Sequence, residues 1–162
     1  LAPSHGDVKL LIAGDGDAGY LDALRRRARE LGIADRIVWL GHVAGAQKAE
    51  AFRSADIFVL PSFSENFGIA AAEAMAAGLP SVLSSGIAIS SEAERAGAAI
   101  AVAPDSAAVA DAIGRLLDDA PARRAMSEAA IAHVRLNYSC ERMADQLTSL
   151  YSRIGAGGAP AR

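Results

Sequence analysis

Two patterns of hydrophobic and polar positions alternate along this chain. Short apolar runs, typical of strands buried on both faces, predict strands at residues 8–13, 37–40, 57–60, 81–83 and 99–102. Apolar residues that recur every three or four positions predict helices at residues 20–31, 46–53, 69–77, 105–117, 121–137 and 139–154, with a helical turn ending at residue 95. The alternation predicts an α/β fold, in which a parallel sheet carries helices on both faces.

The order of these elements also predicts where a ligand binds. Right-handed crossovers place the carboxyl ends of parallel strands on one edge of the sheet. The loops after Ala13, Leu40, Leu60 and Leu83 are therefore expected to converge at that edge. Sheets of this kind bind their ligands there.

Composition limits the class of protein. Hydrophobic residues make up 52% of the 162 positions and charged residues 22%, which argues against disorder. We expect one domain over residues 1–154, with a flexible lead-in at residues 1–7 and a flexible tail at residues 155–162. No apolar run reaches the roughly 18 residues that a membrane span needs. Cys140 is the only cysteine, which excludes an intrachain disulfide and fits a cytoplasmic location.

Charge gives no indication of a nucleic-acid partner. The net charge is −3, and the only basic cluster is the arginines of residues 25–29. Asp22 and Glu30 stand beside them at helical spacing, which predicts a solvated helix face. Capping residues mark other helices: we expect Asp105 or Ser106 to cap one, and Ser139 to cap the last.

Residues 14–19 read GDGDAG and match the G-x-G-x-x-G pattern of dinucleotide sites. Asp15 and Asp17 would lie beside the pyrophosphate, where such a site offers neutral backbone. The pattern also needs an acidic residue near the end of the second strand to bind the ribose, and residues 40–42 are Leu-Gly-His. We therefore interpret the segment as a tight turn into a helix.

The most informative stretch is residues 61–84, PSFSENFGIAAAEAMAAGLPSVLS. It follows a predicted strand and contains Glu65 and Glu73, with seven residues between them. Glu73 lies in a helix of small apolar residues, which predicts burial on all sides. A buried carboxylate needs partners, and either a sugar diol or an arginine would supply them. The alternative is that the alanine side of the helix is exposed.

Glu65 precedes the start of that helix. It could act only through its favourable interaction with the helix dipole, and Asn66 could be an ordinary N-cap. Alternatively, free N–H groups at Gly68, Ile69 and Ala70 would form an anion site for a phosphate. The two carboxylates would then be on the order of 10 Å apart, with a diphosphate between them.

This stretch resembles the signature of retaining glycosyltransferases of family 4, E-x-F-G-x-x-x-x-E-A-M-A-x-G-x-P. The flanking segments LLIAGDG, IVWLGHV and SADIFVLPS agree with the same family, and the resemblance covers roughly residues 8–150. It implies the C-terminal, Rossmann-like donor-binding half of a GT-B fold. The implied activity is bacterial glycan biosynthesis, in which a sugar moves from a UDP-, GDP- or ADP-linked donor to an unknown acceptor with retention of configuration.

The resemblance also implies roles for individual residues. Glu65 would be the catalytic residue, binding donor-sugar hydroxyls without acting as a covalent nucleophile, and Glu73 would bind the ribose. The other implied donor-binding residues are Gly14, Gly41, Val43, Phe67, Gly68, Ile69 and Ala70. The family needs no metal and no cofactor beyond the donor substrate.

Some parts of the family pattern are not found in this chain. The family neutralises the diphosphate with an Arg and a Lys from a strand-loop-helix segment that we expect upstream of Leu1. Neither lysine, Lys9 or Lys48, matches that position. The N-terminal acceptor domain, through which peripheral membrane association is expected, lies outside the chain as well. Residues 85–88 replace a Gly-Gly pair of the family.

We therefore expect the chain alone to be inactive and the parent protein to be the enzyme. The alternative is a non-catalytic nucleotide-binding or interaction module with the same fold. A receiver-like phosphate-binding domain is a weaker alternative, because Asp15 and Asp17 supply only part of its acidic cluster.

Overall fold

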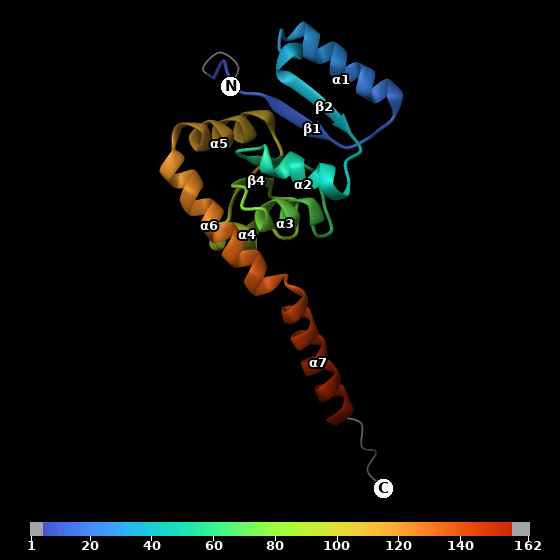
Figure 1. Ribbon diagram of the computed structural model, residues 1–162, viewed down its shortest axis with the longest axis vertical. Coiled ribbons are helices and arrows are strands. Elements are labelled where there is room, and N and C mark those ends of the chain that lie inside the picture. Colours follow the sequence, from blue (N-terminus) through green and yellow to red (C-terminus); the bar gives the residue numbers. More distant parts are fainter. Residues whose placement is uncertain (1–4, 157–162) are drawn as a thin grey trace. The chain divides into compact units, whose positions relative to one another are not determined.

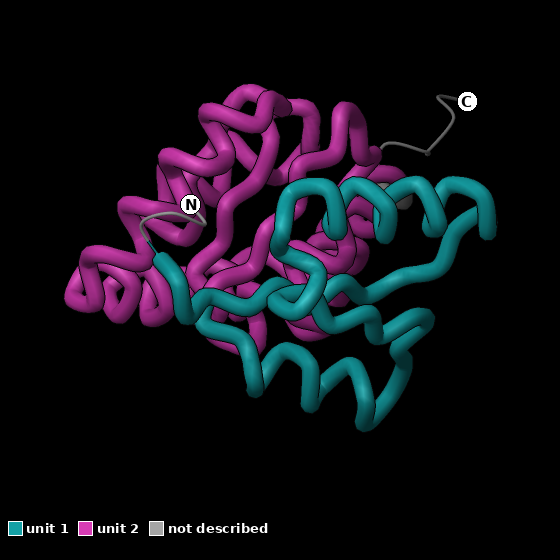
Figure 2. The backbone as a smooth tube through the Cα atoms, turned by 90° about the horizontal axis from the view of Figure 1, so that it is seen from above, with its two compact units in different colours: residues 1–56 teal, residues 57–162 magenta. Residues whose placement is uncertain are grey.

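The computed structural model describes residues 5–156. The chain divides into two compact units, Leu1–Asp56 and Ile57–Arg162, which are coloured separately in Figure 2. Each unit contains a parallel sheet with its own helices. The expected lead-in and tail fall partly on residues 1–4 and 157–162, which lie outside the described residues.

The first unit is built around two parallel strands. Its elements are β1 (Leu10–Ala13), α1 (Ala18–Glu30), a 3-10 turn (Ala34–Arg36), β2 (Ile37–Gly41) and α2 (Gly45–Arg53). The crossover through α1 brings Leu10 opposite Ile37 in the sheet. Asp17 caps α1 by accepting a hydrogen bond of 3.1 Å from the N–H of Tyr20.

The arginines of α1 form the solvated face that the sequence predicted. Arg25 pairs with Asp22 at 3.2 Å and Arg27 pairs with Glu30 at 3.3 Å, and all four side chains are exposed. The guanidinium of Arg25 also lies 5.5 Å from the ring centroid of Trp39. Neighbouring groups on the same unit thus satisfy these charges.

The second unit has three parallel strands in the order β3-β4-β5. Its elements are β3 (Phe58–Leu60), α3 (Ile69–Ala76), β4 (Ser81–Ser84), α4 (Ser90–Arg95), β5 (Ala99–Val102), α5 (Ser106–Asp118), α6 (Ala120–Asn137) and α7 (Cys140–Ala156) (Figure 1). The central strand, β4, is buried along its whole length. It is flanked by a strand on each side, so both its edges are paired.

Side chains of β4 alternate between two hydrophobic clusters. Leu83 packs with Ala71, Met75 and Ala130, which belong to α3 and α6. Val82 packs on the opposite side with Ala112 and Leu116 of α5. Helices therefore cover both faces of this parallel sheet, and the predicted α/β, Rossmann-like fold class is confirmed.

The predicted capping residues are found in place. The carboxylate of Asp105 accepts hydrogen bonds of 3.0 Å from the N–H groups of Ala107 and Ala108 at the start of α5. The hydroxyl of Ser139 accepts one of 3.2 Å from the N–H of Arg142. The last helix extends further than predicted, because it includes Gly155 and Ala156.

The expectation that the alanine-rich helix is buried all round is wrong. Ala71, Ala74 and Met75 of α3 are buried, whereas Ile69 is 68% exposed and Ala70 and Ala76 are exposed as well. Only the stripe at three- and four-residue spacing faces the sheet and α6. The helix therefore has a free apolar side.

The last helix, α7, makes little contact with the rest of its unit. It continues beyond the end of α6 and projects away from α3, α4 and β4 (Figure 1). Its exposed large apolar residues are Met143, Leu147, Leu150, Tyr151 and Ile154. Among the helices of the described residues, none is long and apolar enough to cross a membrane.

Candidate functional site

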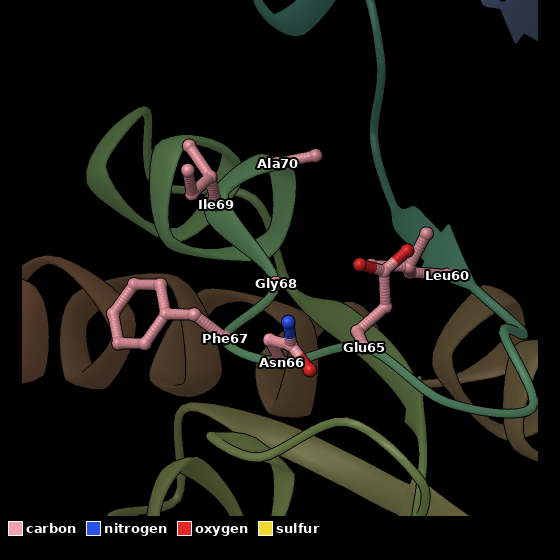
Figure 3. A pocket seen from close by; sticks show the side chains of 7 residues that line it. All are labelled: Leu60, Glu65, Asn66, Phe67, Gly68, Ile69 and Ala70. Atoms are coloured by element: carbon pink, nitrogen blue, oxygen red, sulfur yellow. The ribbon is translucent and has the colours of Figure 1, made fainter.

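A hollow of about 340 Å³ opens between the carboxyl end of β3 and the start of α3. Its lining is shown in Figure 3 and consists of Leu60, Glu65, Asn66, Phe67, Gly68, Ile69 and Ala70. Five of these residues were predicted to bind the donor. The Glu65 carboxylate lies beside Leu60, and Gly68 stands between it and the Phe67 ring (Figure 3).

Gly68 determines how α3 begins. Its backbone is left-handed, with φ 89° and ψ 54°, and a Cβ there would lie 2.7 Å from Cγ2 of Ile87. Glycine alone adopts this conformation readily and leaves that space free. The sequence left Asn66 as a candidate N-cap, but Gly68 occupies that position, and no side chain within residues 5–156 caps the helix.

The residues that begin α3 line the hollow, and no side chain of the described residues caps the first N–H groups of this helix. The first intrahelical hydrogen bonds are those from Ala71 and Ala72 to the Gly68 carbonyl, at 2.9 and 3.1 Å. The N–H groups of Ile69 and Ala70 precede these bonds. Together with the helix dipole, they make this end of the helix suited to an anion.

Glu65 is held by its side chain and by its backbone. The hydroxyl of Ser62 donates to Oε1 of Glu65 at 3.3 Å. The Glu65 N–H donates to the carbonyl of Gly86 at 3.2 Å, and its carbonyl accepts from the N–H of Ala88 at 3.3 Å. The loop after β4 thus fixes the chain at Glu65, although the carboxylate itself remains exposed.

This fixed loop contains residues that the sequence reasoning did not assign to the site. A Cβ on Gly86 would lie 2.0 Å from the carbonyl oxygen of Phe63, so the two loops touch through their backbones. The hydroxyl of Ser84 donates to the Ser62 carbonyl and connects them again. The sequence feature that could have indicated this contact is a single glycine in a serine-rich loop directly after a buried strand.

Glu73 lies beside a second hollow. This hollow is about 460 Å³ and is lined by Phe67, Ile69, Ala72, Glu73, Ala76, Val134, Asn137, Tyr138, Met143 and Gln146. Phe67 and Ile69 line both hollows, so the two lie next to each other. The half-buried Glu73 is on the side of α3 that faces the end of α6, while Glu65 lies in the first hollow.

Two aromatic rings pack against each other where the two hollows adjoin. The rings of Phe67 and Tyr138 meet edge to face, with centroids 5.2 Å apart and planes at 82°. The Tyr138 hydroxyl donates to Oε2 of Glu92 at 3.2 Å. Burial, and secondarily the charge and hydrogen bond of Glu92, raises the pKa of Tyr138 to about 12.

Three of the predicted donor-binding residues belong to the first unit. The N–H of Gly14 donates to the carbonyl of Gly41 at 2.8 Å, which brings the ends of β1 and β2 together. Both glycines have positive φ, 131° and 63°. Val43 follows in the loop before α2. Within this unit, the predicted meeting of strand ends is confirmed.

The described residues contain no group of three or more His, Cys, Asp and Glu side chains that could hold a metal ion. The first hollow is lined by the Glu65 carboxylate, the Asn66 carboxamide, the start of α3 and apolar side chains.

A family model described as glycosyl transferases group 1 matches residues 1–133. The chain belongs to this family. It is 35% identical over 164 residues to a D-inositol 3-phosphate glycosyltransferase of Corynebacterium efficiens, covering 96% of this chain and 38% of the relative. The chain thus spans about two fifths of the length of such relatives.

Solved structures confirm the fold of this family. Sucrose-phosphate synthase from Thermosynechococcus elongatus superposes with a TM-score of 0.80 at 27% identity, covering 93% of this chain and 39% of that protein. HepE from Anabaena, solved in complex with UDP and glucose, superposes with a TM-score of 0.82 at 21% identity, covering 93% and 42%. The group 1 chain therefore has the Rossmann-like fold found in GT-B glycosyltransferases.

Proposed function

We propose that this chain is the donor-binding part of a retaining, family 4 glycosyltransferase and that it binds a nucleotide diphosphate sugar. The observation that carries this proposal is the first hollow, where the uncapped start of α3 and the Glu65 carboxylate lie together. A helix start binds phosphate oxygens and a carboxylate binds sugar hydroxyls. A sugar diphosphate needs both groups side by side.

The diphosphate would lie against the N–H groups of Gly68, Ile69 and Ala70. As the bond to the sugar breaks, negative charge develops on the leaving diphosphate. Donors that are already fixed stabilise this charge without reorganising. The left-handed Gly68, which has no Cβ, supports this role because it leaves the backbone accessible.

Glu65 would position the donor sugar. Its hydrogen bonds with Ser62, Gly86 and Ala88 restrict its movement before the sugar arrives. A carboxylate held in one place contributes to rate by orienting the reacting sugar. We assign it this positioning role in direct contact with the substrate and do not assign it as a nucleophile.

Glu73 would bind the ribose hydroxyls from the adjoining hollow. In the first unit, we propose Gly14, Gly41 and Val43 as further donor-binding residues. The side chains that line the first hollow include neither Arg nor Lys. We therefore propose that the cations for the diphosphate, and the acceptor site, are supplied by other parts of a longer protein, so that these 162 residues alone have no transferase activity.

The names of related proteins guide the choice of substrates. HepE was solved with UDP and glucose, and several relatives are named D-inositol 3-phosphate glycosyltransferases. A UDP-linked hexose and an inositol phosphate are therefore the first donor and acceptor to try. GDP- and ADP-linked donors should be tested beside the UDP-linked one.

The first experiment measures the melting temperature of the 162-residue chain with UDP, GDP and ADP. We expect one of the three to raise it, because a ligand that binds only the folded state stabilises that state. Absence of a shift with all three nucleotides at millimolar concentration would contradict donor binding. The same assay on Glu73→Ala should show affinity weakened by about tenfold, as expected for loss of a charged hydrogen-bonding group.

The second experiment uses the full-length protein that contains this chain. Glu65→Ala should reduce turnover by about 100-fold or more, because the sugar is no longer oriented. Glu128→Ala removes an exposed carboxylate of α6 and serves as the matched control. If Glu65→Ala retains wild-type turnover, the alternative of a non-catalytic nucleotide-binding module is favoured.

A further inference from the structure

The side chain of Phe67 supports the loop that carries Glu65 and Gly68. The backbone of this loop lines the first hollow, while the Phe67 ring, 39% exposed, reaches the second hollow. The position of Phe67 therefore affects its immediate neighbours Asn66 and Gly68. Whatever holds the ring also holds the start of α3.

Tyr138 is the residue that contacts this ring. It is the first residue after α6, where its N–H donates to the Val134 carbonyl at 2.8 Å. Its ring meets Phe67 edge to face with centroids 5.2 Å apart. The ring of the buried His133 packs at right angles against Tyr138, with centroids 5.4 Å apart. Tyr138 thus lies between a buried ring of α6 and the ring of the loop.

The hydroxyl of Tyr138 fixes the ring in a third direction. It donates to Oε2 of Glu92, in the first turn of α4. This helix directly follows the loop whose Gly86 and Ala88 hold the backbone of Glu65. The Tyr138 hydroxyl is a neutral donor at physiological pH, as any tyrosine with its ordinary pKa near 10 is, and burial with the neighbouring Glu92 raises its pKa further, to about 12.

We propose that Tyr138 is a positioning residue for the donor loop: it holds Phe67 through its ring, while its hydrogen bond to Glu92 holds the ring. The loop is then clamped from two sides, by Gly86 and Ala88 at Glu65 and by Tyr138 at Phe67. Tyr138 does not line the first hollow, and its contact with the loop that carries Glu65 and Gly68 is through the ring of Phe67. The consequence for donor affinity rests on the function proposed above.

The first test is a double-mutant cycle on the full-length protein. The probe is whichever of UDP, GDP and ADP stabilises the wild type. We expect Tyr138→Leu and Phe67→Leu each to weaken its binding by about 3- to 10-fold, the range of an aromatic pair, and the double variant to be no weaker than either one. Tyr138→Phe keeps the ring contact but loses the hydrogen bond to Glu92, so it should weaken binding less than Tyr138→Leu does.

Tyr151→Leu is the matched control. Tyr151 is an exposed tyrosine of α7, so its replacement changes the same chemical group at a distance from the loop. We expect it to leave nucleotide affinity unchanged. If the effects of Tyr138→Leu and Phe67→Leu simply add, or if Tyr138→Leu matches the control, Tyr138 does not act through Phe67 and the proposal is overturned.

A second measurement keeps the proposal separate from the proposed function. Amide hydrogen exchange at Ala71 and Ala72, whose N–H groups donate to the Gly68 carbonyl, reports directly on the start of α3 when it is measured without nucleotide. Tyr138→Leu should accelerate exchange there by about tenfold relative to Tyr151→Leu, with no such change in β4. Unchanged exchange overturns the positioning role, whereas accelerated exchange in a protein that binds none of the nucleotides overturns only the function proposed for the site.

Discussion

Three glycines of the second unit differ in what a side chain would meet. Gly68 has both a left-handed backbone and a close neighbour, the side chain of Ile87. Gly86 has a backbone neighbour, and Gly97 has a left-handed backbone, φ 69°, with only an ordinary contact of 3.9 Å to Ala129. Substitutions at these glycines therefore separate the effect of steric contact from the effect of a left-handed backbone. Of these three glycines, Gly68 and Gly86 have neighbours closer than 3.0 Å, and both lie next to the proposed donor site.

Gly86→Ala should lower the free energy of unfolding by about 2–4 kcal/mol, because the new methyl group meets backbone that cannot move without displacing Glu65. Gly97→Ala should cost only about 1–2 kcal/mol, from the left-handed conformation alone. Urea unfolding of both variants provides the comparison. Equal losses would show that the Gly86 loop adjusts freely.

Ser62→Ala tests the side-chain hydrogen bond to Glu65. Loss of this bond of 3.3 Å should reduce turnover of the full-length protein by about 3- to 10-fold, since a typical hydrogen bond contributes 0.5–1.5 kcal/mol. Ser64→Ala, in the same exposed loop, is the control and should keep wild-type turnover. A result in which both variants behave alike would mean that backbone contacts suffice to place Glu65.

Alkaline pH provides a test of Tyr138. Its pKa is about 12 in the folded protein and close to 10 when unfolded, so the folded state retains a proton that the unfolded state loses between these values. Its contribution to stability is therefore fully present below pH 10 and is lost as pH rises towards 12. Tyr138→Phe should make the urea midpoint fall less steeply over this range, whereas Tyr151→Phe should not.

At the scale of elements, the sequence predicted the type and order of every strand and of the seven α-helices in the described residues. Short apolar runs bounded by glycine or proline are typical of buried strands. The 3-10 turn at Ala34–Arg36 was not predicted, because three residues carry no periodicity. The one-sided burial of α3 was missed because alanine fits buried and exposed positions equally well.

The exposed apolar side of α7 gives a prediction for that helix. Leu147→Glu should shift the melting temperature by less than about 2 °C, because a surface substitution changes stability by at most about 0.5 kcal/mol. The control is Leu116→Glu in α5, where the side chain is only 2% exposed and an unpaired charge would be buried. Strong destabilisation by Leu147→Glu would mean that α7 has a partner in solution.

At the scale of the whole molecule, the sequence predicted more about the inside of each unit than about the two units together. Parallel pairing and crossovers place Gly14 next to Gly41 in one unit, and Glu65 next to Gly68 in the other, as expected from strand ends. The contacts of Glu65 with Gly86 and Ala88 could not be predicted, because loop against loop contact follows no periodic pattern. From the sequence, residues 85–88 were identified only as the place where the Gly-Gly pair of the family is replaced.

The strand order of the second unit has a consequence for how the chain folds. In its sheet β3-β4-β5, each strand pairs in parallel with the next strand in the sequence, so each pairing closes over a single crossover. This sequential order allows the unit to form during synthesis from the amino end onward. Gly86 and Ala88 would hold Glu65 as soon as β4 and its loop emerge. Phe67 would wait for Tyr138, 71 positions later, so the loop would reach its final form in two separate stages.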